Sequence, residues 1–187
     1  DTDEHLGTAL IDAVNRIERQ DRVVHGVQVN VHMPKRAELE VFARRFPKKR
    51  VVLQLGPKVV NTKTPAETIC ALLLQYGWLV TDVLLDGSAG TGKAIDPVVT
   101  AYYVAALDHF APHLGIGVAG RLCEETLSGD VARLLHQIPR LSTDAEGGLR
   151  DDSEGGGLLV HDKARRYVRR SRSIFNGAPK AAEIPTA

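Results

Sequence analysis

The sequence predicts an α/β fold in which short parallel strands alternate with crossover helices. Apolar runs of strand length alternate with segments of helical period along the chain, and this rhythm is typical of parallel strands joined by right-handed crossovers. At least the first three runs are apolar enough to predict strands buried on both faces. The 187 residues, of which 43% are hydrophobic, suffice for a full core. Two architectures fit, a (β/α) barrel and an open doubly wound sheet.

Five strands are expected, at Val23–Val31, Val51–Leu55, Val83–Leu85 with their flanks, Ile116–Ala119 and Leu141–Thr143. Helices are expected at Leu6–Arg19, Lys35–Phe46, Pro65–Gln75, Pro97–His113, Glu124–Gln137 and Asp162–Ser173. Thr64 to Glu67 matches a capping box with proline at the first helical position, and Asp96 before Pro97 is an acidic cap. A closed barrel of eight strands usually takes about 250 residues. We therefore expect about three barrel strands to lie before Asp1 or to be supplied in another way.

The chain is predicted to form one domain, residues 1–175, followed by a flexible tail of small residues and prolines, residues 176–187. The acidic, glycine-rich segment Asp151–Gly157 is expected to be mobile.

Composition argues against several classes of partner and cofactor. Lys plus Arg against Asp plus Glu is 24 to 23, so neither a nucleic acid nor a membrane surface is expected as a partner. The basic segment Lys163–Arg172 could form a nucleic-acid or phosphate patch. Ala164, Tyr167 and Val168 at helical spacing favour instead a closing helix with a solvated cationic face. Cys70 and Cys123 are far apart, and no apolar stretch is long enough to span a membrane, which favours a cytoplasmic protein with reduced thiols. The seven histidines show no ligand spacing, so no metal and no cofactor are expected.

The segment Val83 to Asp96, VLLDGSAGTGKAID, is the strongest candidate for a site. Asp86 ends a strand, and ligand sites of parallel α/β folds lie beyond the carboxyl ends of the strands. Gly87, Gly90 and Gly92 allow backbone N–H groups to approach an anion, and Lys93 adds a positive charge. The alternative is a plain glycine-rich turn in which Asp86 caps only local amides.

A nucleotide-binding interpretation of the same loop is also open. Gly87 to Ala94 fits the P-loop spacing GxxxxGK, with Ala94 where a Ser or Thr should bind magnesium. However, Pro97 marks a helix start four residues too late, which disfavours this interpretation.

The segment DVLLDGSAGTGKAID resembles the part of phosphoribosylanthranilate isomerase in which a barrel strand ends in a catalytic aspartate before a GGTG-like loop. Four further segments are similar to that family in the same order, so that the resemblance covers roughly residues 22–172: VHGVQVNV (24–31), GIGVAGRLCEETL (115–127), LSTDAEGGLRD (141–151) and LLVHDKARRYV (158–168).

The resemblance implies a TIM barrel, a small phosphorylated sugar or related anionic ligand, and an Amadori-type aldose–ketose isomerisation in tryptophan biosynthesis. Asp86 matches the general acid, which needs a pKa raised by burial to act near neutral pH. The resemblance further implies a phosphate- and substrate-binding set consisting of Gly90, Gly92, Lys93, Gly120, Arg121, Asp144, Gly147 and Gly148.

The chain also departs from the family. The general-base cysteine and the substrate-clamping arginine have no counterpart, and Cys70 and Cys123 are better interpreted as packing thiols. Asp144 and Glu146 add negative charge where a phosphate should bind. The sequence thus leaves open an isomerase, a non-catalytic barrel used for ligand binding or protein association, and a P-loop protein. A homodimer is compatible with each.

Overall fold

The computed structural model describes residues 5–60, 63–88, 96–138, 140–151 and 157–177. Five parallel strands form one sheet in the order β1-β2-β3-β4-β5. The strands are β1 (Gly26–Val29), β2 (Arg50–Leu55), β3 (Asp82–Asp86), β4 (Gly115–Ala119) and β5 (Leu141–Thr143). The helices are α1 (Leu6–Glu18), α2 (Arg36–Arg45), α3 (Ala66–Leu74), α4 (Pro97–Phe110), α5 (Glu124–Thr126), α6 (Ala132–Gln137) and α7 (His161–Gly177). Short helical turns lie at η1 (Gly77–Leu79), η2 (Leu127–Val131) and η3 (Gly147–Leu149).

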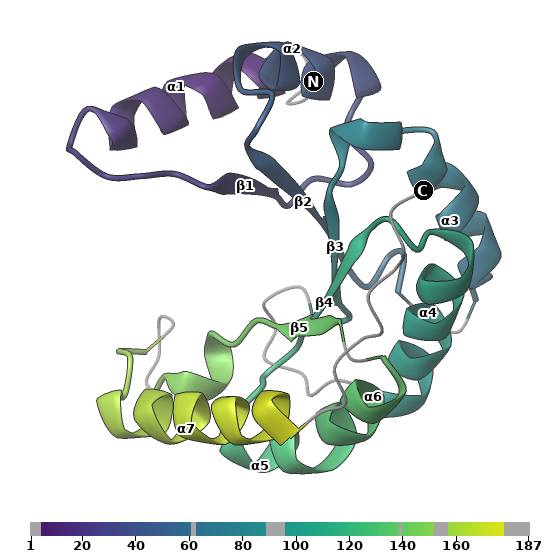
Figure 1. Ribbon diagram of the computed structural model, residues 1–187, viewed down its shortest axis with the longest axis vertical. Helices are drawn as coiled ribbons and strands as arrows, with labels where there is room; N and C mark the ends of the chain where they lie inside the picture. The colour runs from purple at the N-terminus through teal and green to yellow at the C-terminus, as the bar shows by residue number, and fades with distance from the viewer. Residues whose placement is uncertain (1–4, 61–62, 89–95, 139, 152–156, 178–187) are drawn as a thin grey trace.

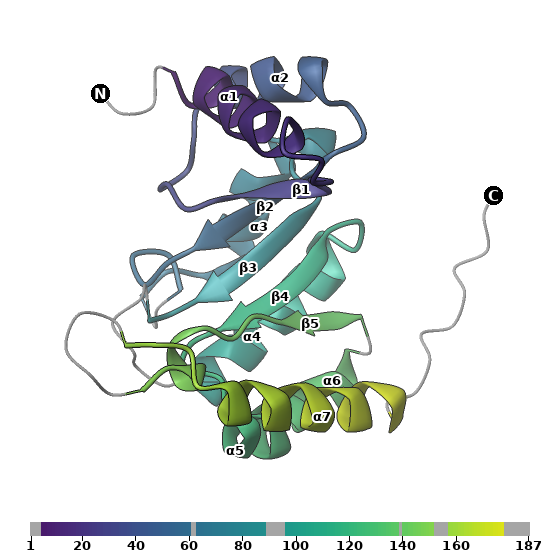
Figure 2. The same cartoon turned by 90° about the vertical axis from the view of Figure 1, so that its left-hand side faces the viewer.

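The strand order decides between the two predicted architectures. A doubly wound sheet reverses its strand order at a switch point, whereas these strands follow one another in chain order. Figure 1 shows the sheet bent into an arc with the helices on its outer side. Figure 2 looks onto the inner side, where the five strands lie one below another between α1 and α7. The predicted α/β fold of barrel type is confirmed, and the open doubly wound alternative is wrong.

Several predicted boundaries change. β1 is shorter than the predicted Val23–Val31 because its register with β2 extends only from Gly26 to Val29. The predicted helix at Glu124–Gln137 contains a π-helical turn between α5 and α6. α7 continues to Gly177, so the predicted flexible tail cannot begin at residue 176. The remainder of that tail and residues 152–156 lie outside the described residues.

One of the two predicted helix caps is wrong. Asp96 caps α4 as predicted, since its carboxylate accepts hydrogen bonds from the backbone N–H groups of Val98 (3.0 Å) and Val99 (3.1 Å). At α3, no side chain caps the helix start. Instead, the N–H of Ala66 donates to the Tyr102 hydroxyl on α4 at 3.1 Å, so a tertiary contact satisfies this helix end.

The main core lies between the sheet and the outer helices. Alternate residues of each strand point outward, and those of the three central strands are buried, as are Leu39 and Phe42 of α2, Leu73 of α3 and Tyr103 and Leu107 of α4. None of the described helices is both long and apolar enough to cross a membrane.

The inner face of the sheet has a different chemistry from the outer face. The predicted burial on both faces is confirmed for β3 and for most of β2, whereas β1 exposes Gln28. Paired residues of parallel strands project to the same side, and the register aligns Gln28 with Val52, Gln54 with Leu84, and Gly117 with Ser142. Glutamine, glycine, serine and aspartate therefore occupy inward-facing positions, although the strands are apolar at most of their other positions.

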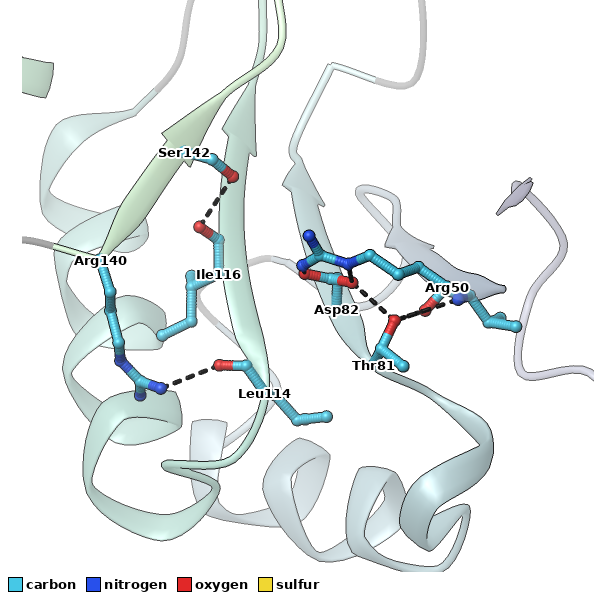
Figure 3. A network of polar contacts seen from close by, with 8 residues as sticks. Arg50, Thr81, Asp82, Leu114, Ile116, Arg140 and Ser142 are labelled. Carbon is cyan, nitrogen blue, oxygen red and sulfur yellow. Dashed lines mark hydrogen bonds and ion pairs between the residues drawn. The ribbon is translucent and has the colours of Figure 1, made fainter. Parts of the chain in front are cut away.

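Polar contacts tie the amino-terminal ends of the strands together (Figure 3). The Arg50 guanidinium of β2 pairs with Asp82 of β3, with Nε 2.8 Å from Oδ2. The Thr81 hydroxyl donates to the same carboxylate at 2.6 Å. At the opposite edge of the sheet, but again at the amino-terminal ends of the strands, Arg140 donates to the Leu114 carbonyl at 3.0 Å. This contact fixes the start of β5 beside β4.

The two adjacent tyrosines of α4 provide a matched test of this packing. Tyr103 is fully buried, and its hydroxyl lies 2.8 Å from the Val59 carbonyl and 2.7 Å from the Thr64 carbonyl. Tyr103→Phe should lower the free energy of unfolding by about 1–2 kcal/mol, because buried carbonyl groups lose a donor. Tyr102→Phe removes the hydroxyl that accepts from the Ala66 N–H, but water can replace it at this exposed ring, so the loss should be smaller, about 0.5–1 kcal/mol. Urea unfolding measures both, and equal losses would contradict the assignment.

Candidate functional site

A row of polar side chains crosses the inner face near the carboxyl ends of the first three strands. Gln28 Nε2 donates to Gln54 Oε1 at 2.8 Å, and Gln54 Nε2 donates to Asp86 Oδ2 at 2.7 Å. The row runs from exposed Gln28 on β1 to buried Gln54 and Asp86. Sequence reasoning singled out Asp86 and missed both glutamines, although each interrupts an apolar run (VQV, LQL) in which it is the polar residue.

Asp86 lies at the carboxyl end of β3, as predicted, and its carboxylate is held on both oxygens. Oδ2 accepts from Gln54, while Oδ1 accepts from the Ser88 backbone N–H at 2.9 Å and the Ser88 hydroxyl at 2.6 Å. Hydrogen bonds on both oxygens fix the orientation of this carboxyl group. The local-capping alternative explains the Ser88 contacts but leaves out the bond from Gln54 on the neighbouring strand.

A second carboxylate, Asp144, follows β5 on the same inner side. Its backbone N–H donates to the Val118 carbonyl at 2.9 Å, and it has the strand parity of Ser142. Asp144 is exposed on this open face, and the partial desolvation that it still undergoes raises its pKa. The negative charges of Glu146 and Asp86 raise that pKa further. The site thus contains two carboxyl groups in unlike environments, one held by several donors and one that retains its proton more readily.

A cavity of about 460 Å³ extends along the inner face from Asp144 and Ser142 to Arg50 and Asp82. Asp86 lies one position beyond the lining residue Leu84 on the same side of β3. Gly117 forms part of the wall, where a Cβ atom would lie 3.0 Å from Leu84 Cδ1 and 3.1 Å from Ser142 Oγ. The glycine therefore leaves space between its neighbours that a larger side chain would fill.

A smaller pocket of about 250 Å³ lies between the loops after β4 and β5 and brings together three of the predicted residues, Arg121, Gly147 and Gly148. Gly148 must be glycine, because a Cβ atom there would lie 2.3 Å from the Leu122 carbonyl oxygen. Cationic Arg150, Lys163 and Arg166 line it together with Glu124 and Glu125. The predicted phosphorylated sugar or other anionic ligand stays a prediction for this pocket.

The other predicted positions are distributed differently. Asp86 and Asp144 belong to the inner face, and Gly120 directly precedes Arg121 with φ of 125°, a conformation that favours glycine. Gly90, Gly92 and Lys93, and with them most of the P-loop pattern, lie outside the described residues.

Both cysteines, Cys70 and Cys123, are free thiols. Cys70 is buried in α3, and burial raises the pKa of its thiol, while Cys123 is half-buried. Within the described ranges, no three His, Cys, Asp or Glu side chains gather closely enough to hold a metal ion.

Comparison with known proteins bears on the fold. No family model and no curated protein matches the chain. Solved structures of chitinase from Pyrococcus furiosus do match. Catalytic-site mutants of its active domain 2 align over 94% of this chain and 69% of theirs, with 11% identity and a TM-score of 0.51. Mutants of the same domain complexed with chito-oligosaccharides align over 94% and 68%, with 10% identity and a TM-score of 0.50. At such identities the likeness shows a TIM-barrel-like fold, of which the five parallel strands form a part.

These findings correct the functional prediction. The chain was expected to resemble an aldose–ketose isomerase of tryptophan biosynthesis. The solved structures reported above as similar in fold are chitinase domains, so the isomerase prediction is wrong. The resemblance depended mainly on two short glycine-containing segments, GTGK in the loop after Asp86 and AG at Ala119-Gly120. Short glycine-rich turns recur at the strand ends of many α/β folds, because the same backbone constraint selects glycine there.

The hydrogen-bonded row predicts unequal effects of removing its two glutamines. Gln54→Leu should lower the free energy of unfolding by about 1–3 kcal/mol, because buried Asp86 loses a donor and Gln28 loses an acceptor. Gln28→Leu should cost less, since the exposed Gln28 side chain can be replaced by water. Urea unfolding of both variants measures the difference, and a larger loss for Gln28→Leu would refute the arrangement.

The charges near Asp144 make its titration a test of the site. Because its folded-state pKa lies above its unfolded value, stability should fall as pH rises from the unfolded pKa through the folded pKa, and Asp144→Asn should remove this slope. Glu146→Gln and Asp86→Asn should each lower the pKa of Asp144 by removing a like charge, with the larger effect from Glu146→Gln. Carbon-13 NMR titration of the carboxyl groups measures the midpoints.

Asp162→Asn, on exposed α7, is the control for these titrations. If it shifts the Asp144 midpoint as far as Asp86→Asn does, the proximity of the two inner-face carboxylates is refuted.

Proposed function

We propose that the inner face of the sheet binds a carbohydrate and that Asp86 and Asp144 form a carboxylate pair that acts on a glycosidic bond. The observation that carries this proposal is the placement of two carboxyl groups with unlike environments on one face. Hydrolysis of a glycosidic bond commonly uses such a pair, in which one carboxyl group donates a proton and the other works as a carboxylate.

The environments suggest which carboxyl group has which role. Asp144, with its raised pKa, is the candidate acid that protonates the leaving oxygen. Asp86, which accepts three hydrogen bonds, is the candidate carboxylate that activates water or stabilises positive charge on the sugar ring. One strand separates β3 from β5, so their backbones are about 10 Å apart or closer. Inward-projecting carboxyl groups at this spacing suit the separations of about 5–9.5 Å that glycosidases use.

The rest of the face suits a neutral, hydroxyl-rich ligand. Gln28 and Ser142 line the cavity with an amide and a hydroxyl group, each able to donate and accept hydrogen bonds. The charges of Arg50 and Asp82 neutralise one another at the far end. The likeness to chitinase domains, one of them complexed with chito-oligosaccharides, agrees with this choice of ligand.

Hydrolysis of chromogenic chito-oligosaccharides tests the proposal. Asp86→Asn and Asp144→Asn should each lower kcat about 10²–10⁴-fold, because each removes a group that transfers a proton or stabilises charge. Asp162→Asn on α7 is the matched control and should leave kcat unchanged. The proposal fails if the wild-type protein neither hydrolyses nor binds these oligosaccharides, or if the inner-face variants retain full activity.

A further inference from the structure

α7 exposes a stripe of three arginines, Arg165, Arg169 and Arg172, which we call the arginine stripe. The spacing of four and then three residues places them on one side of the helix. All three are exposed, and no described residue forms a hydrogen bond or an ion pair with them. Between them, Val168 is 46% exposed.

The opposite side of α7 is docked on the protein. Tyr167 is buried, and its hydroxyl lies 2.8 Å from the Thr143 hydroxyl of β5. Ala164, Ile174 and Phe175 pack against the core. Figures 1 and 2 show α7 at the end of the sheet beyond β5, with α5 beside it, and in Figure 2 no other helix lies in front of it. The helix therefore holds the arginine stripe at a fixed place on the surface.

Three further cations of α7 have structural partners and so differ from the stripe. Lys163 Nζ donates to the Arg150 carbonyl at 2.8 Å. Arg166 Nε lies 3.0 Å from a carboxylate oxygen of Glu124, and Arg170 Nε donates to the Ser128 hydroxyl at 2.7 Å. The last two contacts attach α7 to α5 and η2. The stripe makes no comparable contact, so docking of the helix does not explain it.

The stripe carries an electrostatic cost that is only partly compensated. Arginines three and four residues apart on a helix repel one another. Asp162 lies three residues before Arg165 on the same side, and no acidic residue of α7 lies beside Arg169 or Arg172. The whole chain has a net charge of +1, so this accumulation is local. A local cost that is not fully compensated is expected where a surface has a function.

We propose that the arginine stripe binds the phosphate backbone of a nucleic-acid duplex. The guanidinium group forms two parallel hydrogen bonds with a phosphate. The stripe spans seven helical rises, about 10 Å, a length over which a duplex carries about six phosphate charges. This departs from the expectation, drawn from the balanced overall charge, that no nucleic acid binds.

Two other anionic partners fit the surface less well. A helix that lies on a membrane inserts an apolar side, whereas the apolar side of α7 packs against its own protein. Single strands are held largely by stacking on aromatic rings, and the exposed apolar residue within the stripe is Val168. The surface therefore suits backbone contacts to a duplex, without base readout.

Fluorescence anisotropy of a short mixed-sequence DNA duplex across a salt series tests the proposal. Arg165→Gln, Arg169→Gln and Arg172→Gln together should weaken binding at low salt at least tenfold. They should also reduce the slope of log K against log salt by about 2.7, since each phosphate contact contributes about 0.9. Glutamine is a good helix former, and circular dichroism checks that α7 is retained.

The matched control is a triple variant with the same change of charge on other exposed helices, Arg16→Gln, Arg19→Gln and Arg44→Gln on or next to α1 and α2. It should bind the duplex with the wild-type salt slope. The proposal is overturned if the two triple variants bind alike, or if wild-type protein shows no duplex binding at low salt. It is also overturned if phosphatidylserine vesicles or polyglutamate bind the wild-type protein as tightly as the duplex does.

Discussion

The register of the parallel strands is the constraint on which the site depends. Side chains of a strand alternate between the two faces, so a slip of one residue would exchange the faces. With the observed pairing, Leu53 and Val83 face the helices while Gln54 and Asp86 face inward. The outward valines and leucines stabilise this register by burying apolar surface. The polar row is therefore positioned by the core on the other side of the same strands.

The inner face holds two carboxyl groups, Asp86 and Asp144, in different environments. Asp86 is fixed by donors from two elements, β2 and the turn after β3. Asp144 is influenced by the charges of Asp86 and Glu146, and its pKa rises as a result of them and of desolvation. Such a pair can divide the roles of acid and carboxylate without a metal ion, and glycosidic bond cleavage requires that division.

β5 links the two surfaces for which we propose roles. Asp144 follows this strand on the inner side, whereas Thr143 contacts Tyr167 and so docks α7 on the other side. α7, which carries the arginine stripe, consequently lies beside β5 at one edge of the sheet (Figure 2).

Local sequence determined where the strands and helices lie, and tertiary structure determined which of their polar side chains contact one another. The periods of the apolar runs predicted all five strands and the position of Asp86, because periodicity reports which face of a segment is buried. The Asp96 cap was also local and was predicted correctly. The Thr64 cap was wrong because Tyr102, 36 residues away from Ala66, supplies the contact instead.

The partners of Asp86 could not be predicted in the same way. Gln54 meets Asp86 only through the pairing of β2 with β3, a contact between residues 32 positions apart. The raised pKa of Asp144 likewise depends on desolvation by the folded protein, on Glu146 and, to a smaller extent, on Asp86 from another strand. Periodicity in one dimension identifies which side chains are turned the same way, whereas their distances and charges are decided only when the strands are placed side by side.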